Sequence, residues 1–262
     1  GSFGENYALN KHASTNQYGM NQVSIPSYKA DLNSESYDKK IYPKGTLYKT
    51  AVSFEGITNV SYKNMDGQVV RKAAVRGIQT GDPDYGSALI TDYVHDDYGN
   101  LRAILPPQAK GDISAGNYVY KFLYDKRNRL IKKEIPGAGC ITMEYDKLDR
   151  LIRETDAKGT RTYIKYDELS RPIETGYLSP QESPEGGGSA TSGKEIVLSR
   201  TYYDNYNFAF AKGNPCSDEH AANNLGRITG SETRILGSDT WIKAVSYYDK
   251  EGRVIEAISQ NN

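Results

Sequence analysis

The sequence predicts an all-β fold, a meander of short antiparallel hairpins that forms a curled sheet or a partial β-shell. The first observation behind this prediction is a motif, Tyr-Asp followed by a turn and an Arg-Leu pair, which recurs along the chain. The second is the composition, in which 22 Tyr stand against 5 Phe and 1 Trp. Tyr favours strands, and it buries its ring while its hydroxyl stays in water. Such a chain is expected to build many half-exposed strands.

The motif recurs at a regular spacing. Tyr124, Tyr145 and Tyr166 open successive copies at equal distances along the chain. Other copies, clear or weaker, open at Tyr248, His95, Lys63 and Asn223. Self-similarity at a short fixed period indicates an array of supersecondary units.

Each copy begins with the chemistry of a tight turn. Asp at the first turn position accepts hydrogen bonds from the backbone just ahead of it. The clear copies place an Asp in this position, namely Asp125, Asp146, Asp167 and Asp249. Hairpins are therefore expected at all four places.

The residue three positions after this Asp must adopt a positive φ, which closes the hairpin with a bulge. Gly99 and Gly252 fill this slot without steric cost. Asn128 and Asp149 fill it in their copies, and both residue types tolerate the left-handed region better than most. Ser170 is the least suitable occupant, so a strained or variant turn is expected there.

The turns divide the centre of the chain into short strands. Pro-Gly at 136–137 and Asp-x-x-Gly at 156–159 supply the turns between copies. Strands are therefore predicted near 118–124, 129–135, 140–145, 150–155, 160–166 and 171–175.

Side chains alternate between the two faces of a strand, so each strand predicts an apolar and a charged face. In the last complete copy, Thr162, Ile164 and Tyr166 share the apolar face, and Arg161 and Lys165 lie opposite. The repeated Tyr is thus interpreted first as a packing element between strands.

The organisation along the chain follows from where the repeats are regular. Residues 1–50 are predicted to be an irregular N-terminal segment with ragged strands. Residues 51–176 form the hairpin array, and 177–195 form a flexible loop rich in Pro, Gly and Ser. Residues 196–262 continue the hairpins, with a long loop at 212–224.

Charge and apolar content exclude several classes of function. Lys and Arg total 33, and Asp and Glu also total 33. Zero net charge leaves no electrostatic footprint for nucleic acid, and no apolar run is long enough to span a membrane. Two cysteines are too few for a disulfide framework, and the sequence leaves open whether Cys140 and Cys216 pair.

Catalytic and metal sites find little support. His95 stands in a repeat position, which favours a strand role over that of a base. Cys216 and His220 would supply only part of a structural zinc set, which needs four ligands. We therefore expect no catalytic residue, no metal and no cofactor. Trp241 and Tyr177 are the candidate ligand contacts, because aromatic side chains stack on sugar rings.

These motifs resemble the YD-repeat, or RHS-repeat, family of very large bacterial secreted and cell-surface proteins. The resemblance rests on an ordered series of segments, among them Tyr42–Thr50, Asp92–Pro107, Lys165–Gly176 and Val245–Ile258. It implies a ribbon of β-hairpins that curls into a hollow shell, which in some members encloses a C-terminal toxin. The chain departs from the family pattern at His95 and in the slots that lack Gly.

The resemblance implies a non-catalytic structural segment, extracellular or on the cell surface, of a shell that encloses or displays a cargo such as a toxin. Its partners would be the rest of a larger polypeptide, an encapsulated toxin domain or surface glycans. The alternative is an extracellular module that binds carbohydrate or cell surfaces through exposed tyrosines. Tyrosines packed across strands favour the wall, and a solvent-facing row of three or more favours the binding module.

Overall fold

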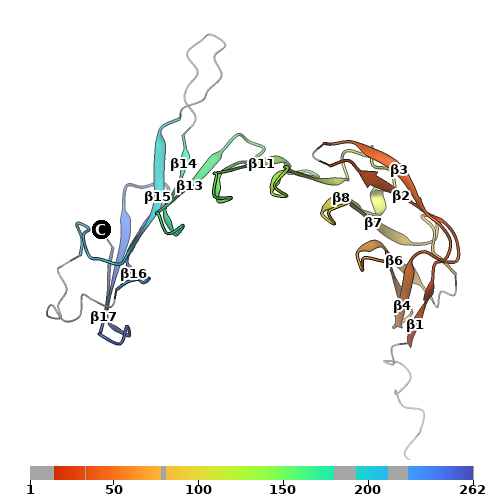
Figure 1. Cartoon of the computed structure of the whole chain (residues 1–262), viewed down its shortest axis with the longest axis horizontal. Coiled ribbons are helices and arrows are strands. Elements are labelled where there is room, and N and C mark those ends of the chain that lie inside the picture. Colours follow the sequence, from red (N-terminus) through yellow and green to blue (C-terminus); the bar gives the residue numbers. More distant parts are fainter. Residues whose placement is uncertain (1–14, 33, 78–80, 180–192, 212–223, 262) are drawn as a thin grey trace, which may run out of the picture. The chain divides into compact units, whose positions relative to one another are not determined.

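The computed structural model describes residues 15–32, 34–77, 81–179, 193–211 and 224–261 (Figure 1). Within these ranges the regular structure is strand, apart from a short 3-10 helix at Pro107–Ala109. The chain divides into two compact units, Gly1–Ile141 and Thr142–Asn262. The predicted all-β class and antiparallel meander are confirmed. The curling of the sheet into a shell stays a prediction.

In the first unit, strands that follow one another along the chain mostly lie side by side. Each pairs antiparallel with its neighbour, in the order β1-β4-β5-β6-β7-β8-β9-β10, while β2 and β3 pair as a separate hairpin. The strands are β1 (Thr15–Met20), β2 (Ile25–Ala30), β3 (Tyr37–Tyr42), β4 (Tyr48–Phe54), β5 (Ile57–Lys63), β6 (Val69–Arg76), β7 (Leu89–His95), β8 (Leu101–Leu105), β9 (Tyr120–Tyr124) and β10 (Leu130–Ile135).

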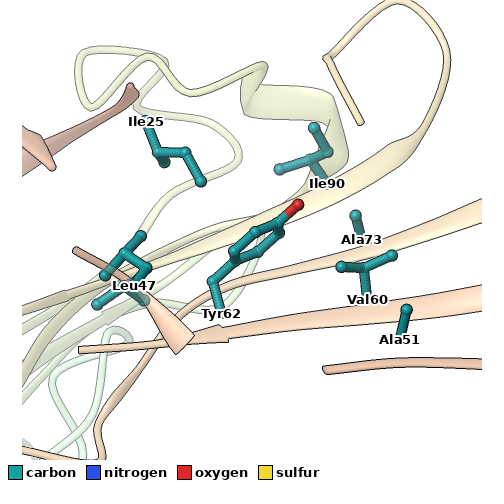
Figure 2. Packing of buried hydrophobic residues seen from close by; sticks show 8 residues of the cluster. Ile25, Leu47, Ala51, Val60, Tyr62, Ala73 and Ile90 are labelled. Carbon is teal, nitrogen blue, oxygen red and sulfur yellow. The ribbon is translucent and has the colours of Figure 1, made fainter. Parts of the chain in front are cut away.

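One face of this sheet carries the core of the unit. Val60, Tyr62 and Ile90 point from β5 and β7 toward Ile25 of β2 and Leu47, the residue before β4, and all five are buried (Figure 2). A second buried cluster joins Ala30 at the end of β2 to strands β7 and β8. Burial of apolar side chains is the main stabilising term, so the β2–β3 hairpin completes the fold as a cover.

Buried cations fasten the cover to the sheet. Lys49 of β4 lies 2.9 Å from Asp82, and Asp82 also accepts from the Val23 N–H at 2.9 Å, just before β2. Arg102 of β8 is fully buried; its Nε donates to the carbonyl of Phe122 and its Nη1 to that of Asp31. A buried charge is tolerated when it is paired and hydrogen-bonded, so both contacts fix where the cover lies.

The second unit repeats the antiparallel pairing. Strand β11, in which the division between the units falls, pairs with β12, and the order continues without a crossover to β18. The strands are β11 (Gly139–Tyr145), β12 (Leu151–Thr155), β13 (Arg161–Tyr166), β14 (Pro172–Leu178), β15 (Glu195–Tyr203), β16 (Ile228–Arg234), β17 (Trp241–Tyr248) and β18 (Val254–Asn261).

The strands predicted between 118 and 175 are confirmed. The structure places β9 to β14 in the six predicted ranges, with ends that shift by up to a few residues. Tyr124 faces Leu130, and Tyr145 faces Leu151, across their own hairpins. The local turn chemistry was sufficient to set this register.

The predicted faces of β13 are wrong in one respect. Tyr163 is the most buried residue of this strand, at 5% exposed, although it shares the face assigned to Arg161 and Lys165. Its ring lies over Gly176 of β14, where an added Cβ would stand 2.7 Å from the ring. Because that glycine leaves room across the strand, an aromatic side chain packs on the face that sequence pattern marks as charged.

Candidate functional site

The described turns of the repeat share one hydrogen-bond scheme. In the copy at Tyr166, Oδ1 of Asp167 accepts from the backbone N–H of Leu169 and of Arg171, both at 2.9 Å. The Ser170 N–H donates to the Asp167 carbonyl at 3.1 Å, and the Asp167 N–H to the Arg171 carbonyl at 3.0 Å. The Asp thus satisfies the backbone donors that a tight turn would leave open.

The φ angles of the closing residues confirm the predicted turn. Asn128 and Asp149 both have φ of 64°, and Gly252 has 78°. Ser170 also has φ of 64° and keeps the same hydrogen bonds, so the variant turn expected there is wrong. The carboxylate of Asp167 accepts from the backbone N–H groups on both sides of Ser170, and the strain expected of this serine stays a prediction.

The arginine that follows the positive-φ residue braces its own turn. Arg129, Arg150, Arg171 and Arg253 each donate from Nε to the second carboxylate oxygen of the turn Asp, at 2.6 to 2.8 Å. Partial burial opposes ionisation of Asp167. Hydrogen bonds from the Arg171 backbone and guanidinium outweigh it, so the pKa of Asp167 lies below its ordinary value.

Two of these arginines, Arg150 and Arg171, also reach the next hairpin. The guanidinium of Arg150 lies 4.7 Å from the ring centroid of Tyr166, and the Tyr166 hydroxyl donates to the Leu151 carbonyl at 2.9 Å. Arg171 lies 4.2 Å from the ring of Tyr203 in the same way. Cation–π stacking and the hydroxyl bond together hold the hairpins of Tyr166 and Tyr203 to the ones before them.

This Arg–Tyr contact recurs around Tyr248. Arg227 lies 5.4 Å from the Tyr248 ring, and the hydroxyl of that tyrosine donates to the Ile228 carbonyl at 2.6 Å. The predicted packing role of the repeated Tyr therefore has a specific form. The ring is half-buried and packs under the arginine of the preceding hairpin.

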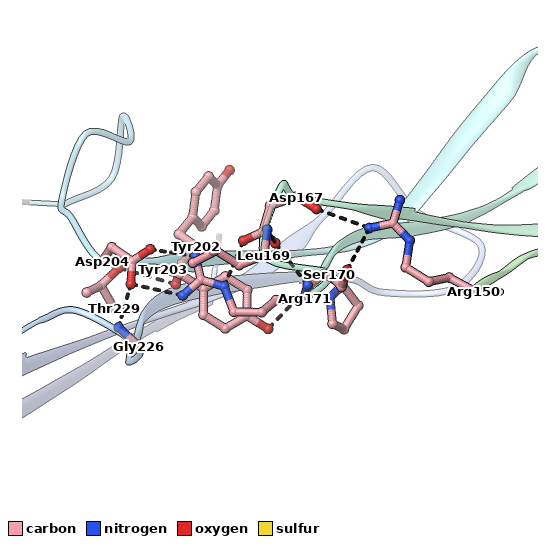
Figure 3. Close-up of polar contacts among 11 residues, drawn as sticks. Arg150, Asp167, Leu169, Ser170, Arg171, Tyr202, Tyr203, Asp204, Gly226 and Thr229 are labelled. Atoms are coloured by element: carbon pink, nitrogen blue, oxygen red, sulfur yellow. Dashed lines mark hydrogen bonds and ion pairs between the residues drawn. The ribbon is translucent and has the colours of Figure 1, made fainter. Parts of the chain in front are cut away.

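One hairpin is interrupted within its turn. Tyr203 and Asp204 open it, but the positive-φ residue, Gly226, and its following Arg227 return only after a long insertion. Oδ1 of Asp204 accepts from the Gly226 N–H at 2.7 Å, and the Asp204 N–H donates to the Arg227 carbonyl at 3.1 Å. The two halves of the turn thus meet across the insertion (Figure 3).

The described start of the insertion packs onto the sheet of the second unit. Phe208 stacks on Tyr202 with ring centroids 4.4 Å apart, and Tyr206 stacks on Tyr247 at 4.9 Å. Tyr247 is completely buried. Aromatic pairs at these distances contribute about 0.5–1.5 kcal/mol beyond area burial, so the insertion supplies this unit with an aromatic core.

A row of alternating charges crosses the second unit. Lys165, Glu174, Arg200, Glu232 and Lys243 lie opposite one another on successive strands β13 to β17. Arg200 bonds to both glutamates, at 2.9 and 3.0 Å. Opposite charges in register stabilise cross-strand pairs, and this row helps to hold the strands in register.

The predicted ligand contacts are not brought together with the braced turns. Tyr177 of β14 is half-buried and lines a pocket of about 240 Å³ with Ile235 and Leu236. Trp241 at the start of β17 is half-buried, with the Arg200 guanidinium 5.9 Å from its ring. The role of both rings as sugar contacts stays a prediction.

The remaining candidates have structural positions. His95 lies in β7 as predicted, and burial lowers its pKa, so its imidazole is neutral at neutral pH. Asp96 accepts from the N–H groups of Tyr98 and Asn100, which confirms it as a turn residue. The described residues hold no cluster of His, Cys, Asp and Glu fit for a metal ion. Cys216 and the loop at 212–223 lie outside the described residues.

The repeat corresponds to a known sequence family. A comparison with family models matches residues 145–181 to the RHS Repeat. The chain carries an RHS repeat. The matched range contains the braced turns of Asp146 and Asp167. A search of curated proteins found no match.

The chain is also similar to several solved structures. These include TcdB2-TccC3-TEV (14% identity, TM-score 0.47) and TcdB2-TccC3-Cdc42 (15%, 0.47), each covering 81% of this chain. The Photorhabdus luminescens Tc holotoxin pore matches 80% of the chain at 14% identity, with a TM-score of 0.46. In each case the match spans 12% of the length of the other chain. None of the described helices is long and apolar enough to cross a membrane.

Sequence reasoning missed the brace arginines. Their signal was present, since an Arg follows the positive-φ slot at 129, 150, 171, 227 and 253. They were interpreted only as part of the motif, and for Arg150, Arg171 and Arg227 the aromatic partner comes from another hairpin.

Proposed function

We propose that the chain is a non-catalytic wall segment of an extracellular RHS-repeat shell, which encloses or displays a cargo such as a toxin domain. The observation that carries the proposal is the brace, the set of contacts in which one arginine binds the Asp of its own turn and the Tyr of the next hairpin. Its repeated Tyr, Asp and Arg bind one another from hairpin to hairpin, as Arg150 does with Asp146 and Tyr166. Residues committed to cohesion in this way suit a wall, because a binding row would need free aromatic faces.

The proposed partners are the rest of a larger polypeptide and its enclosed cargo. A wall protects what lies behind it, so the test is limited proteolysis of the longer polypeptide that contains this segment, with fragments mapped by mass spectrometry. We expect Arg150→Ala combined with Arg171→Ala to open cleavage sites outside residues 1–262. The matched control is Lys158→Ala, whose side chain lies exposed at a turn. Identical cleavage maps for the brace variant and wild type would contradict the proposal.

Glycan binding remains the alternative and is tested on the same proteins. A glycan array would be probed with the wild type and with Trp241→Ala and Tyr177→Ala. Sugar binding that these changes remove, with no fall in the unfolding midpoint, would favour the binding module over the wall.

A further inference from the structure

The sheet of the first unit has one covered and one open face. Along β4 to β7, buried residues alternate with exposed ones, and the buried set faces the β2–β3 cover. The other set forms the open face, which carries Tyr48 (54% exposed), Ile57 (49%) and Leu89 (67%). Tyr48 lies at the end of β4 that pairs with Lys63, and Ile57 lies at the other end beside Phe54, so exposed apolar side chains extend along the face. Exposed apolar surface on one face of a sheet typically marks an interaction surface.

The open face is hollowed. A groove of about 510 Å³ lies along β4 to β7, and its lining includes the hydroxyl residues Thr50, Ser61 and Thr91 together with Leu89 and Pro107. Small side chains, among them Ala73 and Ala74, make up much of the lining. Hydroxyl groups there can bond to a backbone laid along the groove.

The charge of the open face has one sign. Lys63, Lys72 and Arg76 point to this face and are exposed. Among the residues that the structure describes, none of the three forms an ion pair, and the contact recorded for Lys72 is with the ring of Tyr93 at 5.8 Å. The four strands β4, β5, β6 and β7 contain one acidic residue, Asp92, which is buried on the covered face with Arg71; Glu55 and Asp66 lie in the turns that join β4 to β5 and β5 to β6.

We propose that the open face of the first unit docks a polypeptide segment that is apolar and acidic. Apolar side chains would cover Tyr48, Ile57 and Leu89, and carboxylates would pair with Lys63, Lys72 and Arg76. Complementary charge supplies specificity and suppresses wrong partners. A second copy docked face to face would set these cations against one another. A flat lipid surface would leave the hydroxyl groups of the groove without hydrogen-bond partners.

The test is fluorescence anisotropy with a short labelled peptide in which Leu and Glu alternate, together with peptides that alternate Leu with Lys and Leu with Gln. We expect the Leu-Glu peptide to bind most tightly. The double variant Lys72→Glu and Arg76→Glu should weaken it by about tenfold or more, since each reversal replaces attraction with repulsion. The control Lys126→Glu changes an exposed residue of the same unit that lies in a turn, and it should leave the affinity unchanged.

A second variant tests the apolar half of the proposal. Leu89→Ser alters a side chain that is 67% exposed, so it should fold normally and still weaken the Leu-Glu peptide. Equal binding of the Leu-Glu and Leu-Lys peptides would overturn the proposal. So would tighter binding to vesicles of anionic phospholipid than to peptide, or a dimer in sedimentation that Lys72→Glu abolishes. These results do not bear on the wall, which the brace variants of the second unit test separately.

Discussion

Arg171 donates to both carboxylate oxygens of Asp204, with 2.9 Å from Nη1 to Oδ1 and 2.5 Å from Nη2 to Oδ2. Its Nε meanwhile donates to Asp167 at 2.7 Å (Figure 3). One guanidinium therefore joins an intact turn to the interrupted one. The planar fork of arginine allows this double contact, which the single ammonium of lysine cannot reproduce.

Loss of this guanidinium should loosen the second unit. We expect Arg171→Ala to lower the urea midpoint of unfolding clearly, because Asp167, Asp204 and the Tyr203 ring lose a shared partner. Arg171→Lys should recover only a minor part of the loss. Lys158→Ala, which removes the same charge from an exposed turn, serves as the control. A midpoint for Arg171→Ala equal to that of the control would refute the brace.

The brace should also make stability depend on pH. Hydrogen bonds from the Arg171 side chain and the Gly226 N–H hold the pKa of Asp204 at about 2, below the ordinary 3.8. A depressed pKa in the folded state means that the stabilisation is fully present above the unfolded pKa and is lost as pH falls through the folded one. Midpoints of the wild type and Asp204→Asn should therefore differ at neutral pH and converge between about pH 4 and pH 2.

The measurement is urea unfolding of both proteins across that pH range. The control is Glu168→Gln, which removes an exposed carboxylate in the Asp167 turn. Its urea midpoint should follow that of the wild type at every pH. A gap between wild type and Asp204→Asn that stays constant down to pH 2 would show that the Asp204 carboxylate does not carry the effect.

Substitutions at the positive-φ position of the turn should change the free energy of unfolding according to how well each residue tolerates that conformation. Asp149 has φ of 64°. Asp149→Gly should be neutral or stabilising by up to about 1 kcal/mol, while the β-branched Asp149→Val should cost about 1–2 kcal/mol because its Cβ crowds the carbonyl in this region. Asp149→Asn keeps a residue type that tolerates the slot and should lie near wild type. Denaturant unfolding ranks the three, and a Val variant as stable as the Asn variant would contradict the turn assignment.

The sequence predicted features that depend on contacts within one hairpin, and it did not predict those that depend on contacts between residues far apart in the chain. The strands from 118 to 175 and the φ of Asn128 and Asp149 follow from local rules, since turn chemistry and two-residue alternation act within one hairpin. The second contact of Arg171, with Asp204 across the insertion, joins two hairpins and leaves no mark in either turn alone. The cover over the first unit escaped prediction for the same reason, because buried Arg102 bonds to carbonyls far away in sequence.

The last prediction compares two tyrosines on opposite faces of β13, the buried Tyr163 and Tyr166, which packs under Arg150. Tyr163 is 5% exposed and packs over Gly176, so Tyr163→Ala should cost about 3–5 kcal/mol, as for a large buried aromatic residue. Tyr166 is half-buried under Arg150, and Tyr166→Ala should cost about 1.5–3 kcal/mol. Leu169 is 71% exposed in the neighbouring turn, and Leu169→Ala should lower the free energy of unfolding by under about 0.5 kcal/mol. Denaturant unfolding of the three variants gives the order directly. A smaller loss for Tyr163 than for Tyr166 would mean that the repeated slot, rather than the glycine-backed face, holds the core of this sheet.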